Sequence, residues 1–103
     1  MACALIITTC GSRESAETIA GLLVRERLAA CVQRMPIEST YLWKGEICNS
    51  AEIVLLIKSR TELFEAISAR IRENHPYELP EIILLPIAGG LPGYLRWIEE
   101  STG

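Results

Sequence analysis

His75 has the clearest capacity for metal chemistry in this sequence, because an imidazole nitrogen suits copper and zinc. It is the only histidine, and Pro76, Tyr77 and Glu78 follow it directly. Pro76 disfavours helix at the residue before it, so we expect the His75 ring to project from an extended loop. A metal or a small anion could bind there if a neighbouring subunit completes the site. The alternative is that His75 and Tyr77 only form hydrogen bonds that hold the turn.

Thiols are the second group of candidate metal ligands. The four cysteines include no Cys-x-x-Cys pair, and the aliphatic residues can build a core without disulfides, so we expect reduced thiols and a cytoplasmic protein. Cys10 lies where a strand should end and a helix begin, and a helix N-terminus lowers the pKa of a nearby thiol. Cys31 alternates with apolar residues, as a small buried side chain would, and is the third candidate ligand.

No catalytic arrangement is recognisable along the chain. The sequence has no Ser, His and Asp in a triad order, no glycine-rich phosphate loop and no His-Glu-x-x-His motif. Glu78 and Glu81 lie close together on a segment interrupted by Pro80, which does not define an acid–base pair. The sequence therefore predicts a protein that is not an enzyme.

Composition narrows the classes of partner. The 103 residues carry a net charge of −3 and no cluster of Lys or Arg, which argues against nucleic acid. No apolar run approaches the ~20 residues of a membrane span, so we expect no membrane partner. The length suits a single domain over residues 1–103. Hydrophobic residues make up 50% of the chain, which is high for so small a domain.

The elements that would position these residues alternate between strand and helix. Ser12 is placed to cap one helix, and Ser59-x-x-Glu62 has the pattern of a capping box before another. Alternation with period two, followed by the Lys44-Gly45 turn, predicts a hairpin in which Pro36 requires an edge strand or a bulge. The expected strands are residues 2–9, 29–43, 46–58 and 81–87, and the expected helices are 13–27, one after 62 and a short one from 92.

This order of elements defines a fold class. A β-α-β-β-α-β chain with a short C-terminal helix is an α+β ferredoxin-like sandwich, with a long hairpin between its second and third strands. A small doubly wound sheet is the alternative, but it would need a helix where the Lys44-Gly45 turn lies. The sequence therefore predicts the ferredoxin-like sandwich.

Two features indicate that the chain is not a monomer. Hairpin arms of ~13 residues reach about 43 Å, whereas a helix of ~14 residues spans about 21 Å, so the hairpin should extend beyond its helices. Strands such as residues 53–57 and 82–85 are apolar on both faces, and two helices cover only one face of a sheet. We expect a second subunit to cover the other face.

Six short motifs in order along the chain are Leu28-Ala29-Ala30-Cys31-Val32, Tyr41-x-Trp43-x-Gly45, Leu63-Phe64-Glu65-Ala66, His75-Pro76-Tyr77-Glu78-x-Pro80-Glu81, Leu85-Pro86-Ile87 and Tyr94-Leu95-x-Trp97. Together they resemble the CutA family, which is named for divalent-cation tolerance. The resemblance covers almost the whole chain. Departures from the family's usual pattern, such as Gln33, Leu42 and Gly93, concern bulge, turn and cap geometry more than architecture.

The resemblance implies a ferredoxin-like subunit in a homotrimer built like the PII signalling proteins, with hairpins that hold neighbouring subunits. It also implies a role in metal tolerance and a weak link to copper or another divalent metal. His75, Cys10 and Cys31 are then the candidate ligands. Two other functions remain open: a regulatory scaffold that senses a small molecule in clefts between subunits, and a scaffold for protein partners.

Overall fold

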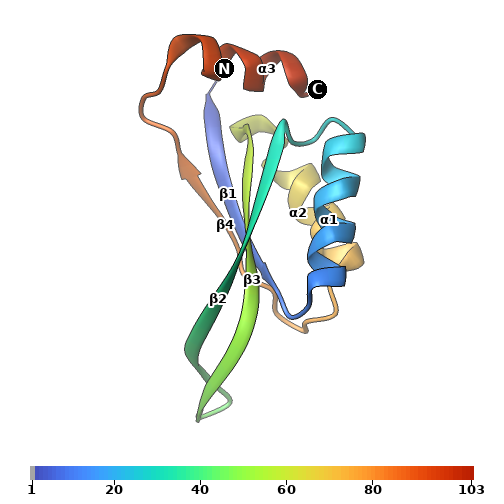
Figure 1. The fold of residues 1–103 in the computed structure, drawn as a ribbon, viewed down its shortest axis with the longest axis vertical. Helices are drawn as coiled ribbons and strands as arrows, with labels where there is room; N and C mark the ends of the chain where they lie inside the picture. The colour runs from blue at the N-terminus through green and yellow to red at the C-terminus, as the bar shows by residue number, and fades with distance from the viewer. Residues whose placement is uncertain (1) are drawn as a thin grey trace.

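The computed structural model describes residues 2–103 and contains one four-stranded sheet with helices packed on it (Figure 1). The strand order is β2-β3-β1-β4, and every neighbouring pair is antiparallel. The predicted α+β ferredoxin-like order, with its long hairpin and its last short helix, is confirmed. The elements are β1 (Cys3–Cys10), α1 (Arg13–Arg25), β2 (Cys31–Trp43), β3 (Glu46–Arg60), a 3-10 turn η1 (Thr61–Leu63), α2 (Phe64–Asn74), β4 (Ile82–Pro86) and α3 (Pro92–Ser101).

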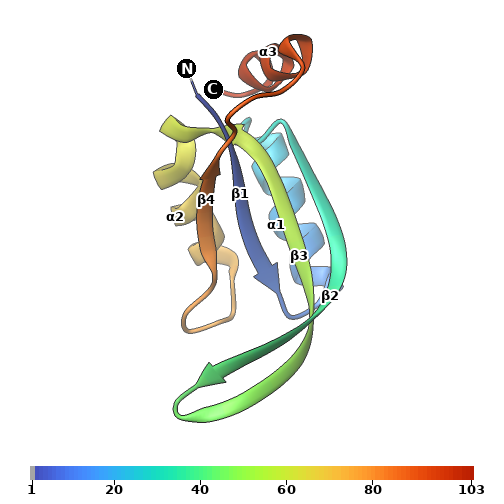
Figure 2. The ribbon, with the colours of Figure 1, turned by 90° about the vertical axis from the view of Figure 1, so that its left-hand side faces the viewer.

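The hydrophobic core lies between the sheet and one layer of helices. Alternate residues of a strand point to opposite faces, so one side of β1 and β3 meets α1 and α2. The core residues there are fully buried, because each lies on the inner stripe of its helix or the inner face of its strand; they include Ile6, Ile19, Leu23, Leu55, Ile57, Ile67 and Ile71. Figure 2 looks onto the opposite face of the sheet, with α1 and α2 behind it and α3 across one end.

Local signals placed one helix start correctly and one incorrectly. Ser12 caps α1 as predicted, because its side chain accepts a hydrogen bond from the Ser15 amide at 3.1 Å. The predicted capping box at Ser59-x-x-Glu62 is wrong. Ser59 is buried in β3 and donates to the Leu28 carbonyl at 2.5 Å, so its hydroxyl is not available to a helix amide. Residues 61–63 instead form η1, which leads into α2.

The β2–β3 hairpin is paired without interruption from Cys31 opposite Lys58 to Trp43 opposite Glu46. Pro36 lies on the edge strand, as predicted, and no bulge is needed there. The turn places Lys44 at φ 51° and Gly45 at φ 81°, a conformation that glycine adopts without strain. The hairpin accounts for the longest dimension of the subunit, which measures 44 × 25 × 22 Å, and its outer half extends past α1 and α2 (Figure 2).

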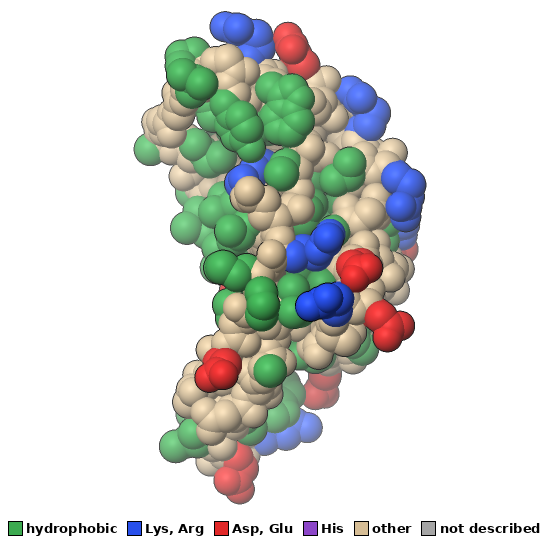
Figure 3. All heavy atoms as spheres, in the orientation of Figure 1, with side chains coloured by type: hydrophobic (Ala, Val, Ile, Leu, Met, Phe, Trp, Pro, Cys, Tyr) green, Lys and Arg blue, Asp and Glu red, His purple; other side chains and the backbone are tan. Residues whose placement is uncertain are grey.

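The sheet face that points away from α1 and α2 is here called the open face. It carries large apolar side chains that residues 2–103 leave exposed, and α3 adds two aromatic rings beside it. Figure 3 shows hydrophobic side chains gathered over α3 and along this side of the sheet. The exposed residues are Met35 (52%), Ile83 (46%), Leu85 (42%), Tyr94 (41%) and Trp97 (43%). This surface is where the sequence places its excess of apolar residues.

Candidate functional site

His75 lies at the end of α2, where the chain turns towards β4. Its backbone is extended, as the following proline predicts. The ring is buried and both of its nitrogens are used. Nδ1 accepts a hydrogen bond from the Tyr77 amide at 3.2 Å, so Nε2 carries the proton and donates to the Thr9 carbonyl at 2.6 Å. These are the contacts expected of a residue that holds the turn, and they leave no free lone pair on the ring for a metal.

Tyr77 joins this turn to the base of the hairpin. Its ring packs edge-on against His75, with centroids 4.7 Å apart, and its hydroxyl donates to Glu52 Oε2 at 3.0 Å. Gly11 allows this approach, because a Cβ at that position would lie 2.8 Å from the Tyr77 hydroxyl. Burial, and then the hydrogen bond to the Glu52 carboxylate, raise the pKa of Tyr77 to about 12. The Tyr77–Glu52 contact therefore favours the protonated phenol.

Glu52 is the residue of this region that the sequence did not reveal. It lies on β3 within a stretch of alternating side chains and is only 9% exposed. It borders a pocket of about 950 Å³ between the curved hairpin, the loop after α2 and the start of β4. We call this the hairpin pocket, defined by Thr9, Tyr41, Trp43, Glu52, Tyr77, Glu78 and Glu81.

Cys10 is the last residue of β1 and points into the core, where it is fully buried. Burial raises the pKa of its thiol, a hydrogen bond with Ser15 partly lowers it, and the charge of Glu52 raises it again, so that the pKa is raised overall. The predicted lowering of this pKa by the start of α1 is therefore wrong. The thiol faces the inner side of the sheet, near Ser15 in the first turn of α1, and burial outweighs the lowering that this neighbour causes. The Cys10 thiol is therefore shielded from solvent.

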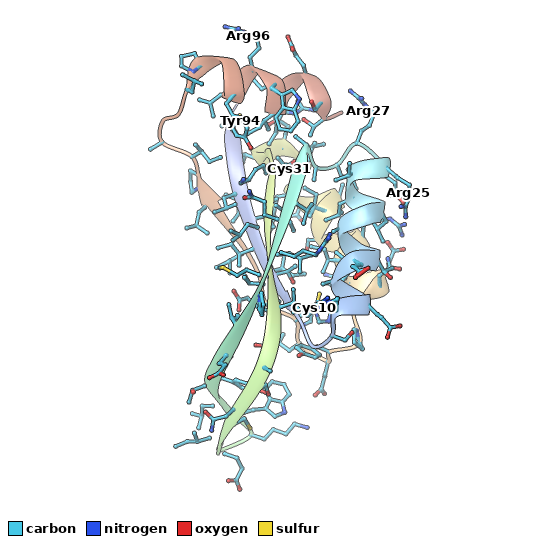
Figure 4. All side chains as sticks on the ribbon, viewed as in Figure 1. Cys10, Arg25, Arg27, Cys31, Tyr94 and Arg96 are labelled. Carbon is cyan, nitrogen blue, oxygen red and sulfur yellow. The ribbon has the colours of Figure 1, made fainter. Side chains whose placement is uncertain are left out.

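Cys31 lies at the other end of the sheet from Cys10 (Figure 4). It is half-buried and pairs with Lys58 of β3, whereas Cys10 pairs with Ile53 of the same strand. Five residues of strand separate these positions by about 17 Å, too far for one ion. Residues 2–103 contain no group of three His, Cys, Asp or Glu that could hold a metal. His75, Cys10 and Cys31 of one chain are thus not gathered into a single site.

The raised pKa of Tyr77 leads to a spectroscopic prediction. We expect a tyrosinate absorbance phase near pH 12 that is missing in Tyr77→Phe and moves towards the ordinary value of 10.0 in Glu52→Gln. Because the folded pKa lies above the unfolded one, the burial and the hydrogen bond of the Tyr77 phenol stabilise the fold fully below pH 10, and this stabilisation is lost as the pH rises towards 12. An identical titration of wild type and Glu52→Gln would contradict the assigned contact.

The fold and the turn at His75 define a structural class of protein. The chain is a ferredoxin-like subunit with a long hairpin and an uncovered sheet face. Residues 4–101 match the family model described as CutA1 divalent ion tolerance protein. The chain belongs to this family, as the six sequence motifs predicted. None of the helices in residues 2–103 is long and apolar enough to cross a membrane.

Relatives agree over nearly the full chain. The divalent-cation tolerance protein CutA of Thermus thermophilus is 46% identical over 100 residues, which cover 96% of this chain and 97% of that protein. The chloroplastic protein CutA 1 of Oryza sativa is 41% identical over 95% of this chain, which spans only 56% of that relative. The crystal structure of CutA1 from Oryza sativa superposes with a TM-score of 0.96 at 39% identity, covering 100% of this chain and 95% of that one.

Proposed function

We propose that this chain is a homotrimeric divalent-cation tolerance protein, which binds copper or another divalent metal weakly and takes part in the response to metal ions. The observation that carries the proposal is the family match over residues 4–101, together with relatives that are named for divalent-cation tolerance and not for a reaction. The proposed location is the cytoplasm, in keeping with four cysteines that form no disulfide.

Assembly into a trimer is supported by the open face. Its apolar side chains lie beside the aromatic rings of α3, and the hairpin adds Leu42 (71% exposed) and Ile47 (76% exposed) on its outer part. Apolar surface of this extent on a small subunit is typical of a protein–protein interface. A second and third copy would cover it without any other partner.

The proposed metal ligands differ in what binding would require of the protein. Cys31 is half-buried on the open face, so binding there would not require the thiol to leave the core. His75 would have to give up the Thr9 or the Tyr77 hydrogen bond, and Cys10 would have to leave the core. Because no three donors meet within residues 2–103, the metal would need ligands from more than one subunit. This requirement agrees with weak binding by an assembled protein.

Calorimetric titration with Cu(II), and with Cu(I) under reducing conditions, tests the metal. We expect Cys31→Ser to weaken Cu(I) binding by about tenfold or more, because a thiolate is a far softer ligand than a hydroxyl. His75→Ala should also reduce the heat if the imidazole leaves its turn to bind. The matched control is Cys48→Ser, since Cys48 is another half-buried thiol of the hairpin. Equal binding by Cys31→Ser and wild type removes Cys31 from the site, and equal binding by His75→Ala removes His75.

A second candidate function is a trimeric regulatory scaffold that senses a small molecule in clefts between its subunits. The hairpin pocket favours it, because a concave site of about 950 Å³ is large enough for a metabolite. Thermal-shift measurements against nucleotides and metabolites, each with and without metal, separate the two functions. A shift produced by a metabolite without any response to metal would favour the sensor.

A further inference from the structure

The hairpin pocket is built by parts of the chain that are distant in sequence. Thr9 precedes the last residue of β1, Tyr41 and Trp43 lie near the tip of the hairpin on β2, and Glu52 lies on β3. Residues 77–81 form the loop that closes the other side. In Figure 2 the hairpin curves beneath this loop. Lys44 at the hairpin tip bonds Glu78 of the loop at 3.8 Å. This ion pair links the hairpin to the loop on the other side of the pocket.

The charge of the hairpin pocket is negative. Its lining includes Glu52, Glu78 and Glu81 and, within residues 2–103, no Lys, Arg or His. Glu52 is the deepest of the three carboxylates at 9% exposed, and the Tyr77 hydroxyl bonds only its Oε2. Lys44 stands at the rim, where its side chain and that of Glu78 are 72% and 73% exposed. A carboxylate held this deep without a cationic partner favours a positively charged ligand.

Aromatic rings form the other chemical feature of the hairpin pocket. Tyr41, Trp43 and Tyr77 line it together. One of these rings already contacts a cation of the same chain, because the Lys44 ammonium lies 5.6 Å from the centroid of the Trp43 ring. Ring faces attract cations through their quadrupoles, and the attraction is stronger where water is excluded. The deep Glu52 carboxylate and the aromatic walls suit a cation that also has an apolar body.

The type of cation follows from the spacing of the donors. Residues 2–103 contain no group of three acidic, His or Cys side chains close enough to hold a metal ion, so the carboxylates of the hairpin pocket are spread apart. We propose that the hairpin pocket binds a small organic cation, an amidinium, guanidinium or amine on a compact apolar body, with Glu52 as the main charge partner and Trp43 and Tyr77 as walls. This proposal goes beyond metal tolerance and does not depend on a bound metal.

Benzamidine and benzamide form the test pair, because they have the same shape and differ in charge. In a Trp97→Phe background Trp43 is the only tryptophan and reports on the hairpin pocket. We expect benzamidine to change Trp43 fluorescence saturably, and benzamide to bind about tenfold more weakly or less, as a charged and ring-stacked contact requires. Equal responses to both compounds, or no saturable response to benzamidine, would overturn the proposal.

Glu52→Gln locates the charge partner. The amide keeps an oxygen acceptor for the Tyr77 hydroxyl but removes the charge, so we expect benzamidine affinity to fall about tenfold while benzamide is unaffected. Glu65→Gln on α2 is the matched control, because it removes an exposed carboxylate on the helix side of the sheet. Retained affinity in Glu52→Gln, or an equal loss in Glu65→Gln, contradicts the assignment.

A neighbouring subunit is the competing occupant of the hairpin pocket, and sedimentation of each variant identifies it. If wild type does not bind benzamidine and Glu52→Gln dissociates the assembly, a basic side chain of a second copy fills the space and the proposal is wrong. Copper titration of the same samples keeps this result separate from the proposed function. Loss of copper binding with benzamidine binding retained would contradict only the proposed function. Loss of benzamidine binding with copper binding retained would contradict only the cation pocket.

Discussion

Wild-type protein is expected to sediment as one particle of about three times the 11.4 kDa chain mass, and Leu85→Glu is expected to sediment as a monomer. Leu85 lies on β4 within the open face and is 42% exposed in the single chain. In the proposed trimer that exposed part is covered, and a buried carboxylate without a partner costs several kcal/mol. One such cost in every subunit is enough to dissociate a trimer of small chains.

Val24→Glu is the matched control for this experiment. Val24 is also apolar and similarly exposed, at 44%, but it lies on α1, on the helix side of the sheet. We expect this variant to keep the sedimentation coefficient of wild type. A wild-type particle of single-chain mass would refute the trimer outright. Dissociation by Val24→Glu but not by Leu85→Glu would instead place the interface on the helices.

Ile57→Ala is expected to produce the largest loss of stability among single substitutions in the core. Ile57 is fully buried on β3, opposite Ile6 of β1 and Val32 of β2. It belongs to the cluster that joins the sheet to both principal helices, so the cavity would lie inside the core. Removing a buried aliphatic side chain in this way lowers the free energy of unfolding by about 2–5 kcal/mol.

Urea unfolding at a fixed protein concentration measures this loss, because the stability of an oligomer depends on concentration. The control is Val24→Ala, which removes an exposed aliphatic side chain. We expect the control to change the unfolding free energy by less than about 1 kcal/mol. A loss below 1 kcal/mol for Ile57→Ala would show that this part of the sheet is not packed as described.

The order of strands and helices could be predicted from the sequence because its signals are local. Period-two alternation, the Lys44-Gly45 turn and the Ser12 cap each involve residues within a few positions of one another. Ser59 shows the limit of such signals. Its spacing to Glu62 matches a capping box, but pairing of β3 with β1 continues to Arg60 and buries the Ser59 hydroxyl against Leu28, 31 positions earlier in the chain. Tertiary contacts outweighed the local pattern.

The candidate site could be predicted only in part, for the same reason. The sequence drew attention to His75 and Tyr77 because histidine occurs once and a proline follows it. It did not point to Glu52, because the contact with Tyr77 spans 25 positions and Glu52 is one of several polar residues in an alternating strand. The chemistry of Cys10 was misjudged because its position before a helix says nothing about which face of β1 it occupies.

By itself, the sequence determined the main elements of this protein, their order and its family, and it limited Pro36 to an edge strand or a bulge. These properties follow from residue spacing, turn chemistry and motifs, which act over short stretches of chain. Only the tertiary structure decided how the side chains with chemical capacity are used. It engages both ring nitrogens of His75, buries Cys10 in the core, separates Cys10 from Cys31 and brings Glu52 to Tyr77 beside the hairpin pocket. Such outcomes depend on contacts between distant segments, which form only when the sheet and its helices pack together.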